Sequence, residues 1–196
     1  MDRNRVVVAL TGASGAGYGF ELVKGLKEAG RVISVIYNDT ALKILEDEHD
    51  LGYGDLEKYS DEMIHTSGMD HALASGSNPF DSMVISPCST STASKISAGI
   101  ADNLATRCAA VALKEKRKLV LVVRETPLSS PVLRSLYDLS TWGVIVMPAS
   151  PPLYGRSTGS TKEMMKAFSG RIMDLLGIDN DLSERYSPES TKSEKR

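Results

Sequence analysis

Short runs of β-branched and other apolar residues alternate with longer helical stretches, and this alternation constrains the fold more than any other feature of the sequence. The apolar runs are continuous rather than alternating in polarity, as expected of strands that are covered on both faces. We expect five strands, at Val6–Leu10, Val32–Tyr37, Met83–Ser86, Leu119–Val123 and Val144–Met147. Strands of this kind separated by helices predict a parallel sheet with right-handed crossovers. The chain is therefore expected to be an α/β protein with a Rossmann-like doubly wound parallel sheet in a single domain.

The helical stretches lie between these strands. We expect helices at Tyr18–Ala29, Thr40–Asp47, Ser91–Asn103 continuing toward Lys116, Pro131–Thr141 and Thr161–Leu176. Gly30 follows the first of them, at the position where a glycine often ends a helix. The last helix carries its apolar residues three and four positions apart, so it has one apolar face, which we expect to pack in the core or against another subunit. Trp142 is expected to be buried between helix and strand.

Length and charge narrow the class of protein. At 196 residues the chain suits one domain, which we assign to residues 1–182, followed by a polar tail at 183–196. The net charge of −2 gives no basic excess for nucleic acid or an anionic membrane surface. The run Val6–Leu10 is too short to span a membrane and no signal sequence precedes it, so a cytoplasmic protein is expected. Cys88 and Cys108 show neither metal-ligand spacing nor a disulfide framework.

Ligands of open parallel sheets bind beyond the carboxyl ends of the strands, so the residues that directly follow each strand are the candidates for a site. The first strand leads into Thr11–Gly19, T-G-A-S-G-A-G-Y-G. A glycine-rich turn into a helix lets backbone N–H groups approach an anion. The glycines do not spell G-x-G-x-x-G and no Gly-Lys-Ser/Thr follows, so neither a dinucleotide fingerprint nor a Walker A loop is present. A tight turn with close packing remains the alternative.

Polar residues also follow the later strands. Pro87–Ser94 holds five hydroxyl residues at a helix start, more than capping requires, which favours contact with a phosphate. Arg124 and Glu125 follow the next strand, either as an internal salt bridge or as an anion clamp beside an acid/base group. A proline-rich loop would hold Tyr154 over the same edge. Together these residues predict a cleft for a phosphorylated ligand and leave the reaction open.

Four segments occur in an order and spacing that resemble one family. They are T-G-A-S-G-A-x-Y-G, P-C-S-T-x-T, A-L-K-E-K-R-K-L-V-L-V-V-R-E-T-P and P-A-x-P-x-x-Y, within residues 6 to 178. They resemble the UbiX-type flavin prenyltransferases, and the segment Lys114–Pro127 is the most specific. The resemblance implies a metal-independent homo-oligomer, a dodecamer in the family, that joins reduced FMN and dimethylallyl phosphate. Bonds to the central-ring nitrogen and the adjacent benzenoid carbon of the flavin would give prenylated FMN, the cofactor of UbiD-type decarboxylases.

The resemblance also implies three sets of site residues. FMN would be held by Gly12, Ala13, Ser14, Asn38, Ser89, Thr90, Ser91, Thr92, Arg107 and Arg124. The prenyl phosphate would be bound by Lys114, Tyr154 and Arg171, assembled from neighbouring subunits. The catalytic residues would be Ser14, Glu48 and Glu125. Without the resemblance, Lys114 is one charge of a solvated helix end, Arg171 has no local signal, and Glu48 belongs to an acidic surface run.

The chain departs from the family pattern at several positions. Asn38 replaces a flavin-contacting serine, Ser91 replaces a glycine, and Tyr186 replaces a C-terminal tryptophan. After Tyr154 the chain reads Gly-Arg-Ser-Thr-Gly instead of the usual histidine and proline. An amide can still hydrogen-bond where the serine would, so the change at position 38 is compatible with flavin binding.

Two other functions are considered. The cysteine decarboxylases of the same superfamily use a histidine at the reaction centre, whereas His49, His65 and His71 are expected on the surface or in loops, away from the strand-end motifs. A non-catalytic flavin carrier is the second alternative. A carrier would not need the prenyl-phosphate residues together with Glu125, so their joint presence favours catalysis.

Overall fold

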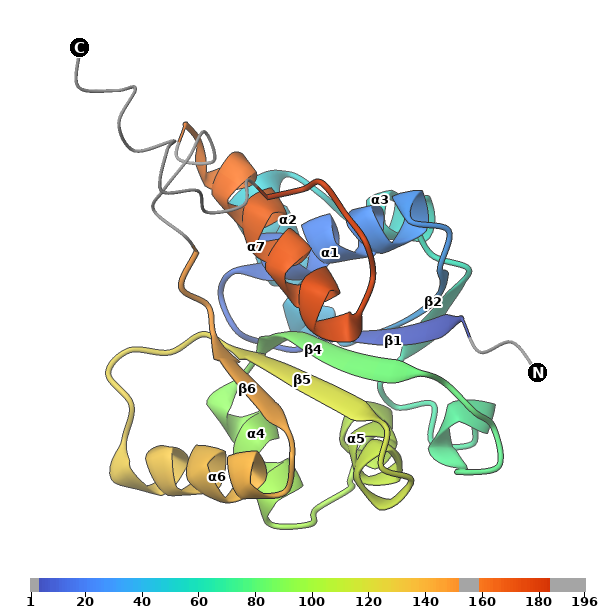
Figure 1. The fold of residues 1–196 in the computed structure, drawn as a ribbon, viewed down its shortest axis with the longest axis vertical. Coiled ribbons are helices and arrows are strands. Elements are labelled where there is room, and N and C mark those ends of the chain that lie inside the picture. Colours follow the sequence, from blue (N-terminus) through green and yellow to red (C-terminus); the bar gives the residue numbers. More distant parts are fainter. Residues whose placement is uncertain (1–3, 152–158, 184–196) are drawn as a thin grey trace.

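Six parallel strands form one sheet in the order β3-β2-β1-β4-β5-β6, with helices on both faces (Figure 1). The structure is a computed structural model that describes residues 4–151 and 159–183. The strands are β1 (Arg5–Leu10), β2 (Val32–Tyr37), β3 (Glu62–His65), β4 (Ser82–Cys88), β5 (Lys118–Val123) and β6 (Ile145–Pro148). The predicted doubly wound parallel sheet in a single domain is confirmed.

The five strands predicted from apolar runs are all present, and β3 is the one that was missed. Only Ile64 of its four residues is buried, because β3 lies at the edge of the sheet and begins and ends with the polar residues Glu62 and His65. A continuous apolar run arises only where both faces of a strand are covered, so an edge strand of this kind gives no such signal.

The helices are α1 (Ala16–Glu28), α2 (Asp39–His49), α3 (Tyr53–Glu57), α4 (Thr90–Ser97), α5 (Leu104–Lys114), α6 (Ser130–Thr141) and α7 (Thr161–Leu176), with a 3₁₀ turn at Ala72–Ala74. The expected long helix from Ser91 toward Lys116 is wrong, since it is divided into α4 and α5. Gly99 has a φ of +70°, which ends the helical path after α4. Asn103 then begins a new helix, because its side chain accepts a hydrogen bond from the Thr106 amide at 3.1 Å.

The sheet separates two apolar cores. Helices α1, α2 and α7 pack on one face and α4, α5 and α6 on the other (Figure 1). The predicted apolar face of α7 packs along α1, where Met165, Phe168 and Met173 are buried and the Phe168 ring meets Tyr18 edge-on, with ring centroids 5.0 Å apart. Core packing of this methionine-containing face is therefore confirmed.

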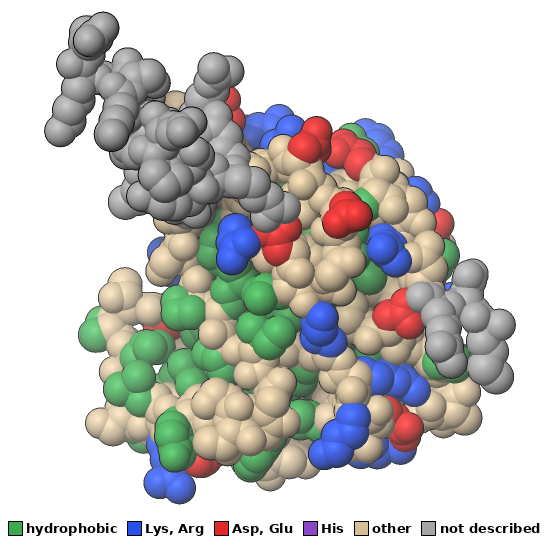
Figure 2. All heavy atoms as spheres, in the orientation of Figure 1, with side chains coloured by type: hydrophobic (Ala, Val, Ile, Leu, Met, Phe, Trp, Pro, Cys, Tyr) green, Lys and Arg blue, Asp and Glu red, His purple; other side chains and the backbone are tan. Residues whose placement is uncertain are grey.

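The expectation for Trp142 is wrong. It follows α6 directly and its side chain is half exposed, at 50%. Beside it, β6 is an edge strand whose first three residues are only partly buried. Figure 2 shows hydrophobic side chains gathered over this part of the molecule, near β6 and α6. In residues 4–151 and 159–183, no helix has the length and apolar character needed to span a membrane.

Candidate functional site

The strand order reverses between β1 and β4, so the loops after these two strands flank the crevice where open sheets bind ligands. Thr11 joins the two loops. Its Oγ1 donates to the carbonyl oxygen of Pro87 at 2.8 Å and accepts from the amide of Ser89 at 2.9 Å, while its own amide donates to Pro87 at 3.3 Å. The glycine-rich and hydroxyl-rich segments, predicted separately, thus form one unit.

The helix that follows the glycine-rich loop, α1, already has a carboxylate bound at its N-terminus. Gly15 precedes α1 with a φ of +94° and has no side chain to cap the helix. The carboxylate of Glu48, at the end of α2, accepts from the Gly15 amide at 2.9 and 3.1 Å and from the Ala16 amide at 3.2 Å. A carboxylate suits the positive end of the helix dipole. Glu48 therefore lies at the surface but does more than belong to an acidic run, because α2 brings its carboxylate to the glycine-rich loop.

The hydroxyl-rich loop presents groups that capping does not use. Ser89 caps α4, its Oγ accepting from the Thr92 amide at 3.2 Å and lying 2.9 Å from Thr92 Oγ1. The first amides of a helix have no partner inside it. Within the described parts of the chain, the hydroxyls of Thr90 and Ser91 make no hydrogen bond. Open amides and hydroxyls at a helix N-terminus fit a phosphate or another anion.

Arg124 and Glu125 follow β5 at the same edge, and both are exposed. No ion pair joins them among the described residues, so the internal salt bridge is not found. Glu125 Oε1 instead accepts from the Thr126 amide at 3.0 Å. The aliphatic stem of Arg124 lies beside the glycine-rich loop, with its Cγ 3.8 Å from the position of a Cβ on Gly15. Burial raises the pKa of the Tyr18 phenol, and the charge of Arg124 opposes that rise.

Glycines 12 and 15 and their neighbours complete this edge. A Cβ on Gly12 would meet Thr40 Cγ2 at 2.9 Å, so the loop lies close to the start of α2. Ala13 is buried, and Ser14 is partly buried, with no hydrogen bond within the described chain. Asn38 follows β2 and caps α2, its Oδ1 accepting from the Ala41 amide at 2.8 Å.

Among the described residues, no hydrogen bond or ion pair joins Lys114 or Arg171 to these loops. Lys114 ends α5 near the start of β5, at the opposite edge of the sheet, and its Nζ lies 2.6 Å from Glu115 Oε1. Arg107 donates from Nε to the Ala74 carbonyl at 2.9 Å. Arg171 is exposed on α7 and pairs with Asp174 at 2.6 Å. Tyr154 and Tyr186 lie outside the described residues.

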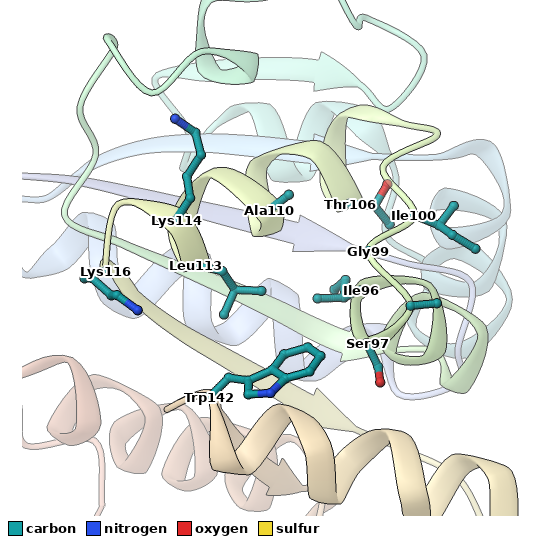
Figure 3. Close-up of a pocket in the computed structure, with 11 residues that line it drawn as sticks. Ile96, Ser97, Gly99, Ile100, Thr106, Ala110, Leu113, Lys114, Lys116 and Trp142 are labelled. Atoms are coloured by element: carbon teal, nitrogen blue, oxygen red, sulfur yellow. The ribbon is translucent and has the colours of Figure 1, made fainter.

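A groove of about 600 Å³ lies between α4, α5 and the end of α6 (Figure 3). Ile96, Leu113 and Trp142 line it, and Lys114 stands at its rim with its amine pointing away from Trp142. The groove is on the face of the sheet covered by α4, α5 and α6, so it is separate from the edge that carries the glycine-rich loop.

The placement of His49 contradicts the sequence expectation. The Nε2 atom of His49 is buried and lies 3.8 Å from Glu48 Oε2. A Cβ added to Gly17 would lie 2.5 Å from this Nε2, so His49 packs against the start of α1. Within residues 4–151 and 159–183 its Nε2 has no hydrogen-bond partner. Sequence reasoning missed it because the contact depends on how α2 packs on α1. The other two histidines are paired, His71 with Glu62 at 2.8 Å and His65 with Ser67 at 2.7 Å.

Among the described residues, the side chains form neither a reactive cysteine site nor a metal-binding cluster. Cys88 and Cys108 are free and buried, and burial raises the pKa of each thiol to about 12. No group of three or more His, Cys, Asp or Glu side chains in these parts of the chain is placed to hold a metal ion.

Known proteins match the chain along most of its length. The Flavoprotein family model matches residues 1–151. The flavin prenyltransferase UbiX of Methanothermobacter thermautotrophicus is 42% identical over 182 residues, which cover 93% of this chain and 95% of that protein.

Solved structures agree with this match. AnUbiX (PadA1), in complex with FMN and dimethylallyl pyrophosphate, has a TM-score of 0.90 and 34% identity, covering 94% of this chain and 98% of that one. A dodecameric FMN-dependent UbiX-like decarboxylase from Escherichia coli O157:H7 has a TM-score of 0.89 and 32% identity, covering 93% and 99%. The resemblance carried by the strand-end segments is confirmed by sequence and by fold, and this chain belongs to the flavin prenyltransferase family UbiX.

Proposed function

We propose that this protein is a flavin prenyltransferase, which joins a dimethylallyl group from dimethylallyl phosphate to reduced FMN. The observation that carries the proposal is the pair of loops linked through Thr11 at the strand-order reversal, with Arg124 beside them. Relatives named flavin prenyltransferases, and a similar structure described with FMN and dimethylallyl pyrophosphate, support the same reaction.

The two helix N-termini at this edge differ in what they can bind. The amides of Gly15 and Ala16 at the start of α1 are occupied by the Glu48 carboxylate, whereas at the start of α4 the amides and hydroxyls of Thr90 and Ser91 have no partner among the described residues. We therefore place the FMN phosphate at Ser89–Thr92, where the helix dipole favours an anion. The flavin ring would then be contacted by Gly12, Ala13, Ser14 and Asn38, with Arg124 at its side. Arg107 would join Arg124 as a basic residue of the FMN site.

Reduced FMN supplies an electron-rich ring system that an allylic group can alkylate. The chain's own residues have two tasks. As the C–O bond of the allylic phosphate breaks, negative charge grows on the departing oxygens, and fixed donors stabilise it. We assign this task to Lys114, Tyr154 and Arg171. A ring proton must then leave, and the exposed Glu125 carboxylate can relay it to the departed phosphate.

We infer that Lys114, and with it Arg171, reaches the flavin from neighbouring copies of the chain. Lys114 lies at the opposite edge of the sheet from the hydroxyl-rich loop, so one chain cannot complete the site. The dodecameric relative from Escherichia coli supports an assembly of copies. Delivery of the product to a UbiD-type decarboxylase and a cytoplasmic location remain predictions.

The test is an anaerobic incubation of the purified protein with reduced FMN and dimethylallyl phosphate, followed by mass spectrometry of the released flavin. We expect a flavin that is heavier by one five-carbon prenyl unit. A parallel incubation with oxidised FMN is the control and is expected to give unmodified flavin. Bound but unmodified FMN, with the diphosphate also supplied, would favour the carrier function and contradict the proposal.

A further inference from the structure

The carboxyl end of α7 and the segment 177–183 that follows it surround the side chain of Asp174 on more than one side. Asp174 Oδ2 accepts from Arg171 Nη1 at 2.6 Å, and its Oδ1 accepts from Asn180 Nδ2 at 3.0 Å. The Asp174 side chain is 17% exposed and that of Arg171 is 48% exposed. One carboxylate oxygen of Asp174 is therefore held by residues 177–183, the return segment, and the other oxygen holds Arg171.

Two glycines allow the return segment to take this path. Gly177 ends α7 with a φ of +77°, and the Ile178 amide donates back to the Met173 carbonyl at 2.9 Å. Gly170 has no side chain where Asn180 packs, since a Cβ there would lie 2.7 Å from Asn180 Oδ1. Asn180 Nδ2 also lies 3.2 Å from the carbonyl oxygens of Gly170 and Ile178, so the amide that contacts Asp174 is itself fixed.

We propose that Asp174 is a positioning residue that orients the Arg171 guanidinium toward the phosphate of the prenyl donor, with Asn180 holding Asp174. This inference rests on the proposed function. Arg171 carries five N–H donors and the Asp174 contact uses only Nη1, so the rest of the guanidinium remains able to bind phosphate.

For phosphate affinity, we expect the gain from holding the Arg171 guanidinium in one orientation to exceed the loss from the negative charge of Asp174 beside it. A long exposed side chain samples many rotamers, and the freedom lost on binding lowers affinity for an anion. A partner that is itself fixed and mostly buried removes that freedom before the donor arrives. The carboxylate also reduces the local positive charge, but the guanidinium stays charged and presents its unused donors in a set direction.

The experiment compares four variants by steady-state kinetics with dimethylallyl phosphate, FMN-binding titration and thermal unfolding. They are Arg171→Ala, Asp174→Asn, the double variant, and Asp138→Asn. The last is a matched control, because it breaks an exposed helix ion pair with Arg134 on α6. We expect Asp174→Asn to raise KM for the donor about tenfold and to lower kcat, because Arg171 also stabilises the departing phosphate, with FMN affinity retained. The double variant should match Arg171→Ala, and the control should match the unchanged protein.

The outcomes separate the inference from the function on which it rests. An unchanged donor KM in Arg171→Ala would remove Arg171 from the donor site and the inference with it, even if the protein prenylates FMN. A raised KM in Arg171→Ala but not in Asp174→Asn would overturn the positioning role alone. A further rise in the double variant would overturn it too, because Asp174 would then act other than through Arg171.

A second variant covers the case in which Asp174→Asn does not fold. Asn180→Ala keeps the ion pair and removes the hydrogen bond to Asp174 Oδ1. We expect a smaller rise in donor KM, about threefold, with FMN affinity retained. An unchanged KM in a folded Asn180→Ala protein would overturn the role of Asn180.

Discussion

Glu48 and Glu125 are both acidic residues near the strand ends, but their surroundings differ. Glu48 is committed to the amides of Gly15 and Ala16, which suits a residue that shapes a loop. Glu125 is exposed, and among the described residues its carboxylate accepts a hydrogen bond from the Thr126 amide alone, so it can turn toward a substrate. Of the two, Glu125 is the better candidate for moving a proton.

Replacing Glu125 by glutamine tests this role. Because Gln keeps the size and polarity of the side chain but cannot accept the proton, we expect FMN binding to persist and the rate of product formation to fall by about 100-fold. Mass spectrometry of the released flavin over time measures the product. Glu46→Gln, another exposed glutamate, is the control. A normal yield from Glu125→Gln would contradict the assignment.

Cys88 directly precedes the hydroxyl residues Ser89–Thr92, yet it is not expected to react. The thiolate is the reactive form of cysteine, and burial raises the pKa of the Cys88 thiol to about 12, so almost none is ionised at pH 8. We expect iodoacetamide at pH 8 to leave Cys88 and Cys108 unmodified in the folded protein and to label both after unfolding in urea. Rapid labelling of the folded protein, followed by peptide mass spectrometry, would disprove this.

At the scale of elements, α2 supplies the cap that α1 lacks. Glu48→Ala should lower the free energy of unfolding by about 1 kcal/mol, as the loss of an N-terminal cap does, and should also weaken FMN binding because the glycine-rich loop loses its support. Glu48→Gln, which keeps one carbonyl oxygen, should have the smaller effect on both. Urea unfolding and FMN titration measure the two quantities, and equal stability of all three proteins would argue against the capping role.

Close packing of α1 on β4 depends on Gly19. A Cβ at this position would overlap the carbonyl oxygen of Ser86, which is backbone and cannot turn aside. We expect Gly19→Ala to lower the free energy of unfolding by about 3 kcal/mol. Gly54→Ala, in α3 with nothing near its Cβ position, should change stability by less than about 1 kcal/mol. Urea unfolding of both variants checks the difference.

The elements with a strong local signal could be predicted from the sequence. The strand Val32–Tyr37 and the helix Thr161–Leu176 are found with the expected bounds. A strand covered on both faces leaves a continuous apolar run in the sequence, and a helix covered on one face leaves apolar residues three and four positions apart. The division between α4 and α5 was missed although Gly99 and Asn103 carry the signals for it. Trp142 could not be placed, because its exposure depends on how α6 ends against the neighbouring elements.

At the scale of the whole molecule, only part of the site follows from the sequence of one chain. The strand-end loops could be found because parallel strands bring their carboxyl ends to one edge. The packing of His49 on Gly17 depends on tertiary contacts that leave no local pattern. Lys114 and Arg171 received their roles from family resemblance alone, and in the described parts of the chain neither has a hydrogen bond or ion pair to the flavin loops.

A shared site predicts complementation between two defective proteins. Lys114→Ala and Arg124→Ala should each be about 100-fold slower. When they are co-expressed with different tags and mixed assemblies are purified through both, part of the activity should return, because some interfaces join an intact Lys114 to an intact Arg124. Mixed assemblies as slow as either parent would indicate that each chain holds a complete site.

The two hydrogen bonds of the Thr11 hydroxyl restrict which sequence changes the two loops can accept during evolution. Because one oxygen donates to Pro87 and accepts from Ser89, the position tolerates serine but not valine, although valine has nearly the same shape. The sequences of the glycine-rich and hydroxyl-rich loops therefore cannot change independently of each other at this contact. A new flavin-loop sequence, whether it arises by descent or by loop grafting, has to keep a hydroxyl here or replace both loops together.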